Sequence, residues 1–130
     1  MPIYTEWDND ARTIIRIHIH DSWDMSEYIQ ASQTTRHMME SVSYPVHLIV
    51  DLTDMKGLPK NMLSGVPAIH AHLLPDQGLV IGVRYPPYVR AIVRAAIRVF
   101  PRFGHNLHFA QTLREARDMI LSHEGLYISL

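Results

Sequence analysis

The chain has 130 residues, a length that suits one domain spanning residues 1–130. Hydrophobic residues make up 47% of it and charged residues 19%, which is typical of globular proteins and excludes disorder as the main state. The sequence contains no cysteine, and this excludes a disulfide framework, a thiol nucleophile and a zinc site built on thiolates.

Charge is distributed unevenly, although the formal net charge is only −1. Residues 1–54 carry a net charge of −6 and residues 55–130 a net charge of +5. Such a chain could steer a charged partner or associate head to tail, unless the charges simply follow the local solvent faces. No apolar run approaches the roughly 20 residues that span a bilayer, and the acidic start is unlike a signal peptide. We therefore expect no nucleic-acid partner, no membrane span and a cytoplasmic location.

The first residues predict two strands joined by a short turn. Residues 3–8 form one strand candidate, and Asn9-Asp10 supplies the turn. In residues 12–20 three isoleucines alternate with polar residues, so the isoleucines share one face of a second strand. Strands joined so closely form an antiparallel hairpin. The opposite face of the second strand carries Arg16, His18 and His20.

Capping motifs and prolines mark the predicted helices. Asp24 and Glu27 form a capping box at the start of a helix that runs to about Ser41. Thr112 and Glu115 form a second capping box at the start of the last helix. The other expected boundaries are helix starts at Pro59, Pro67 and Pro87, and helix ends at Pro75, Pro101 and Gly125.

Three apolar segments predict the remaining strands, over residues 46–53, 79–83 and 107–109. The segment LVIGV at 79–83 has no polar residue, as expected for a central strand that is buried on both faces. The resulting order of elements is β-β-α-β-α-β-α-β-α. It predicts an α/β fold in which a mostly parallel mixed sheet has an antiparallel N-terminal edge hairpin and about four helices.

Four segments together resemble the STAS domains, the family of anti-sigma-factor antagonists (SpoIIAA-like). They are VHLIVDLTDMKGL, WDMSEY, LVIGV and FAQTLREARDMI, and the resemblance covers about residues 13–122. It implies the STAS fold and a regulatory role based on protein binding. In the regulatory members a kinase phosphorylates a serine after the VHLIVDLT-like strand. Here Leu58-Pro59-Lys60-Asn61 offers no hydroxyl, so we expect Lys60 to belong to a docking loop without a phosphorylation switch.

Asp51 and Thr53 lie at the carboxyl end of a predicted central strand, where open α/β sheets place ligand sites. With Asp54 and Lys56 they would form a small polar binding site. The alternative is that Asp51 caps a neighbouring helix or orders the loop that follows. No nucleophile, base or glycine-rich phosphate loop accompanies these carboxylates in the sequence, so we predict neither an enzyme nor a cofactor.

Arg90, Arg94 and Arg98 repeat every four residues on the face opposite the apolar stripe of their helix. Arg84 and Arg102 flank them, and no acid lies between these two. We expect this arginine ridge to bind an anionic group of a lipid, a nucleotide or an acidic protein surface. The alternative is a plain solvated face.

Histidine is frequent, with nine residues, and raises the question of a metal site. His18 and His20 would lie roughly 7 Å apart on one strand face, where they could share an ion, and His47 and His108 could join that face. However, the sequence has no H-E-x-x-H spacing and no cysteine. We therefore predict no metal site, and interpret these residues as a solvated or partner-covered polar face.

The first functional hypothesis is a non-enzymatic regulatory or protein-interaction domain of STAS type. The second is a domain that binds a small ligand such as a lipid or nucleotide, and the third is a metal-dependent enzyme on the histidine face. The tail, residues 126–130, alternates like a strand and predicts a homodimer. Residues expected to line the small-ligand pocket are Met55, Met62, Leu63, Ile69, Leu73 and Leu74.

Overall fold

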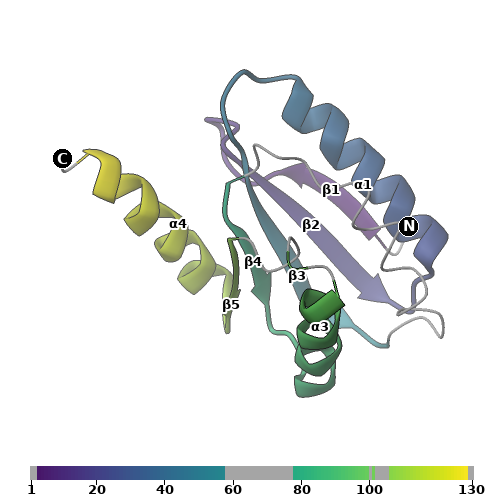
Figure 1. Ribbon diagram of the computed structural model, residues 1–130. Helices are drawn as coiled ribbons and strands as arrows, with labels where there is room; N and C mark the ends of the chain where they lie inside the picture. The colour runs from purple at the N-terminus through teal and green to yellow at the C-terminus, as the bar shows by residue number, and fades with distance from the viewer. Residues whose placement is uncertain (1–2, 58–77, 100, 102–105, 129–130) are drawn as a thin grey trace.

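The computed structural model describes residues 3–57, 78–99, 101 and 106–128, with the backbone alone for 124–128. Strands and helices follow one another in the predicted order (Figure 1). The two expected helices between Pro59 and Pro75 lie outside the described residues, within which there are three helices. The strands are β1 (Ile3–Trp7), β2 (Ile14–Asp21), β3 (His47–Met55), β4 (Val80–Val83) and β5 (Leu107–Ala110), and the helices are α1 (Met25–Glu40), α3 (Pro87–Val99) and α4 (Leu113–Ile128).

The five strands form one mixed sheet in the order β1-β2-β3-β4-β5. β1 pairs with β2 antiparallel, and all other pairs are parallel, which confirms the predicted edge hairpin on a largely parallel sheet. The hairpin turn is held by Asn9, whose side-chain oxygen accepts the backbone N–H groups of Thr13 and Ile14. An asparagine at this position thus replaces backbone hydrogen bonds that the turn cannot make itself.

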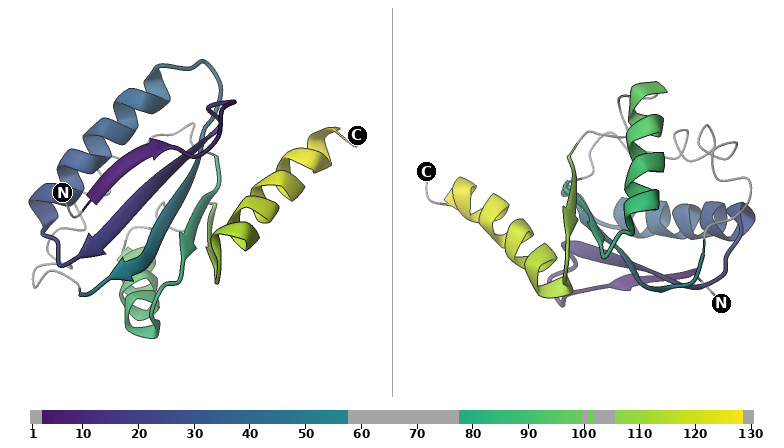
Figure 2. Two further views of the ribbon diagram at one scale, coloured as in Figure 1. Left: turned by 180° about the vertical axis from the view of Figure 1, so that it is seen from behind. Right: turned by 90° about the horizontal axis from the view of Figure 1, so that it is seen from below.

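The helices are placed by the strand order. Each parallel connection moves the chain one strand further in the same direction, and right-handed connections of this kind put their helices on one face. α1 and α3 lie on one side of the sheet, whereas α4, which follows the last strand, lies on the opposite side of β5 from α3 (Figure 2). α4 packs mainly against β3, β4 and β5 and reaches the hairpin only near Ile14 and Asp8. On that side, most of β1 and β2 is therefore not covered by any of the described helices.

Two hydrophobic cores result, one on each side of the sheet. Leu48 and Ile49 are neighbours in β3 and belong to different cores, as the alternation of side chains along a strand requires. The core on the α1 side includes Ile15, Ile17, Ile19, Leu48, Val50, Leu52, Ala31, Met39 and Val89. The core on the α4 side includes Ile14, Ile49, Ile81, Val83, Ala110, Ala116 and Ile120.

Both predicted N-cap residues, Asp24 and Thr112, accept a backbone N–H at a helix start. The Asp24 carboxylate accepts the Glu27 N–H at 2.8 Å, and the Thr112 hydroxyl oxygen accepts the Glu115 N–H at 3.0 Å. The Glu115 carboxylate in turn accepts the N–H of Gln111 at 3.1 Å. These contacts satisfy backbone donors that have no partner inside the helix, and so fix where α1 and α4 begin.

The expectations for the C-terminus are wrong. α4 continues through Gly125 to Ile128, so Gly125 does not end the helix, and residues 126–128 are helical rather than strand-like. A strand needs a neighbour to satisfy its backbone, whereas a helix makes its hydrogen bonds within itself. The alternation of apolar and polar residues in the tail therefore did not make residues 126–128 a strand.

Candidate functional site

Asp51, at the predicted polar site, is buried, with a relative exposure of 6%. Its Oδ2 accepts a hydrogen bond from the Arg16 guanidinium at 2.7 Å. Its Oδ1 accepts the backbone N–H of Thr53 at 3.0 Å and the Thr53 hydroxyl at 2.6 Å. Both carboxylate oxygens thus have partners inside the sheet: Oδ2 joins β3 to β2, and Oδ1 bonds within β3.

The charge state of Asp51 follows from these contacts. Burial opposes ionisation, but the hydrogen bonds from the Thr53 hydroxyl and N–H and the Arg16 guanidinium outweigh it, so the pKa of Asp51 is lowered below its ordinary value. The carboxylate is therefore charged at neutral pH and has its partners in place. This geometry supports the interpretation that Asp51 orders the end of β3.

Asp54 and Lys56, which were expected beside Asp51, each pair with a different residue of β2. Asp54 lies 3.7 Å from Nδ1 of His20, and Lys56 lies 3.3 Å from the Asp21 carboxylate. A register shift between β2 and β3 brings Asp54, and not Thr53, opposite His20. The structure therefore arranges these side chains as successive cross-strand pairs, without a common centre. Lys60 lies outside the described residues.

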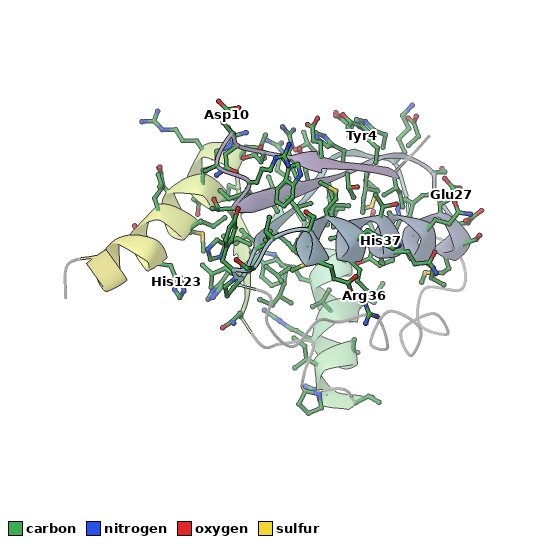
Figure 3. All side chains as sticks on the ribbon, turned by 90° about the horizontal axis from the view of Figure 1, so that it is seen from above. Tyr4, Asp10, Glu27, Arg36, His37 and His123 are labelled. Carbon is green, nitrogen blue, oxygen red and sulfur yellow. The ribbon has the colours of Figure 1, made fainter. Side chains whose placement is uncertain are left out.

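The uncovered side of β1 and β2 carries an ordered group of rings. Tyr4 is stacked on His18 with ring centroids 4.2 Å apart and on His20 with centroids 5.4 Å apart. His18 also lies 2.9 Å from the Glu6 carboxylate through Nε2. In Figure 3 Tyr4 rises from β1 on the side of the sheet away from α1. This arrangement explains how His18 is 7% exposed on a side without a covering helix.

The histidine rings do not converge on one point. His18 and His20 are parallel, with an interplanar angle of 3°, and each faces its own carboxylate. His47 is buried at the other end of the sheet, where its Nδ1 accepts the Leu79 N–H and its ring meets the edge of His123. Within the described part of the chain, no group of three or more histidine, aspartate or glutamate side chains could hold a metal ion.

α3 presents a different arginine surface from the one expected. Arg94 and Arg98 are exposed, but Arg90 is half-buried with its guanidinium carbon 5.0 Å from the centroid of the Phe109 ring. A step of four residues exceeds one helical turn by about 40°, so Arg90 and Arg98 differ by about 80° around the helix. Arg90 therefore faces β5 and does not belong to a solvated ridge. Arg84 is exposed after β4, and Arg102 lies outside the described residues.

The exposed side of α3 also carries an apolar strip that sequence reasoning missed. Tyr88 is 51% exposed and Val99 is 71% exposed. Ala91 and Ala95 are exposed between them, and the i, i+3, i+7, i+11 spacing places all four on one line beside Arg94 and Arg98. The sequence shows this spacing, but it also shows the apolar stripe that was predicted to face the core. In that stripe Val89 and Ala96 are buried, and Ile92, Val93 and Ile97 are half-buried.

Comparisons with known proteins add no family to this description. No protein-family model matches the sequence, and no curated protein matches it. Among the helices of the described ranges, none combines the length and the apolar character needed to cross a membrane. Of the residues expected to line a small-ligand pocket, Met55 packs against the core on the α1 side, and the others lie outside the described residues.

Proposed function

We propose that this chain is a non-enzymatic protein-interaction domain of STAS/SpoIIAA-like type that binds an acidic protein partner through the exposed side of α3. It would do so without the phosphorylated serine of the regulatory family members. The single observation that carries the proposal is the strip of Tyr88, Ala91, Ala95 and Val99 beside Arg94 and Arg98. α3 contains no acidic residue, so its exposed side has one sign of charge.

The composition of this surface favours a protein partner. Tyrosine and arginine are enriched in the centres of protein–protein interfaces, because each covers a large area and keeps a polar group for hydrogen bonding. Guanidinium groups bind carboxylates through two parallel hydrogen bonds, which fits an acidic surface. When a partner covers an exposed apolar side chain such as Val99, the removal of this side chain from water stabilises the complex.

The test is photo-crosslinking in cells of the source organism. A photoreactive amino acid at Ala95 should give a discrete adduct with an acidic protein, and the double change Arg94→Glu and Arg98→Glu should reduce its yield strongly. The matched control places the same group at Gln33, which is exposed on α1. The proposal is wrong if Ala95 and Gln33 give the same adducts, or if the yield at Ala95 does not respond to the charge reversals.

A further inference from the structure

Among the described strands, β5 lies at one edge of the sheet and has backbone groups directed away from it. The Val80 N–H donates to the Asn106 carbonyl and the Arg84 N–H to the Ala110 carbonyl, which sets the parity of the β4–β5 ladder. In a parallel pair every second residue bonds to the neighbour, so His108 and Ala110 bond to β4. The N–H and C=O groups of Leu107 and Phe109 therefore point outward.

A groove of about 610 Å³ lies between β5 and α4. β5 contributes His108, and α4 contributes one helical face that includes Glu115, Asp118, Met119 and Ser122. Each of these α4 positions has another three or four residues away, so all of them lie on one side of the helix. An edge strand with a helix alongside it is the geometry in which proteins accept an extended peptide as an additional strand.

The side chains of the groove indicate the chemistry of such a peptide. Glu115 and Asp118 provide two carboxylates against the one guanidinium of Arg114. The Glu115 carboxylate already accepts the Gln111 N–H, whereas Asp118 is exposed on the wall of the groove. Side chains of an added strand would alternate, so every second one would meet the α4 wall.

We infer that the β5–α4 groove binds an extended peptide segment of a partner by strand addition, with lysine or arginine at alternate positions facing Asp118. The main-chain groups of Leu107 and Phe109 supply the hydrogen bonds of the new ladder, and Met119 supplies apolar contact beside the basic side chains. α4, which contributes most of the groove's lining, lies on the other side of β5 from α3 (Figure 2), so this inference does not depend on the function proposed for α3.

The probe is a displayed library of random eight-residue peptides, selected on the full chain. The sequences of the enriched peptides should alternate between basic and other residues, with lysine or arginine at every second position. With the strongest synthetic peptide, residue-resolved hydrogen exchange should slow at the amides of Leu107 and Phe109. The amides of His108 and Ala110, which already bond to β4, should change little.

The variant Asp118→Lys should weaken peptide binding by about fivefold or more, since an exposed ion pair contributes up to about that factor and the reversal adds repulsion. The matched control is Glu27→Lys, which makes the same charge reversal in the smaller groove between α1 and β1 and should leave affinity unchanged. The inference would be overturned if the selection did not enrich alternating basic peptides, or if hydrogen exchange at Leu107 and Phe109 did not change. Equal effects of the two variants on peptide affinity would also overturn it. None of these results bears on crosslinking at Ala95.

Discussion

Asp51 connects two strands through one carboxylate, because Arg16 occupies one oxygen and Thr53 the other. The partners that keep Asp51 charged include Arg16, which lies 35 residues earlier in the sequence. This side chain therefore contributes to stability in a way that depends on pH.

We predict that Asp51→Asn lowers the free energy of unfolding at pH 7 by about 2 kcal/mol, the range of a hydrogen bond to a charged group. The folded-state pKa of Asp51 is below its unfolded value, so its contribution is present above the unfolded pKa and is lost as pH falls through the folded pKa. In urea denaturation the difference between wild type and variant should narrow below about pH 4. Asp54→Asn, at an exposed partner of His20, should cost well under about 1 kcal/mol at either pH.

We predict that a side chain at Gly82 in β4 destabilises the fold, because a Cβ at this position would overlap the ring of Tyr85. Tyr85 cannot easily move away, since it is packed edge-on against Phe109, with ring centroids 5.0 Å apart. Gly82→Ala should reduce the free energy of unfolding by about 1–3 kcal/mol, the usual cost of overpacking. Gly57→Ala is the control, because nothing lies within 4 Å of an added Cβ there. Equal thermal midpoints for the two variants would show that the ring relaxes.

The polar pairs illustrate what could not be predicted from the sequence at this scale. Asp51, Asp54 and Lys56 were correctly placed at the end of one strand, but their partners lie on β2. Which residue of β2 each one meets depends on the register shift between the two strands, and the sequence of one strand does not show where its pairing with the other strand shifts. The residues that the sequence predicted to form one site therefore make three separate contacts with β2.

Among the elements, α3 gives the clearest test of which side faces solvent. Arg94→Gln and Arg98→Gln should each change the free energy of unfolding by less than about 0.5 kcal/mol, because both side chains are exposed. Arg90→Gln should cost about 1 kcal/mol, since it removes the guanidinium from the face of the Phe109 ring. Chemical denaturation of the three variants measures these differences. A larger loss at Arg94 or Arg98 than at Arg90 would mean that the exposed side of α3 is assigned wrongly.

The elements themselves were largely predictable, and for local reasons. Asp24, Thr112 and Pro87 mark helix starts through contacts or restraints within a few residues, and the structure has helices beginning at each. The end of α4 was not predictable from Gly125, because a glycine inside a helix costs only about 1 kcal/mol and ends a helix only when the next residues find other partners.

For the whole molecule, the homodimer expected from the sequence stays a prediction, but the structure does not support the strand-like tail from which it was argued. Residues 126–128 belong to α4, so truncation after Glu124 shortens a helix and does not remove a strand. Light scattering should give twice the chain mass for the full-length protein and the chain mass for the truncated one. A monomeric full-length protein at high micromolar concentration would contradict the prediction.

The strand order in space is the same as the order in the chain. Each of the described strands therefore joins the edge of the sheet formed by the strands before it, and none of these five has to insert between two others. A chain of this kind can fold while the ribosome is still making it, since every emerging segment finds its neighbour already present. The pair between Asp8 and Arg117, 109 residues apart, is an exception: it fastens α4 to the first hairpin and has to wait until nearly the whole chain has been synthesised.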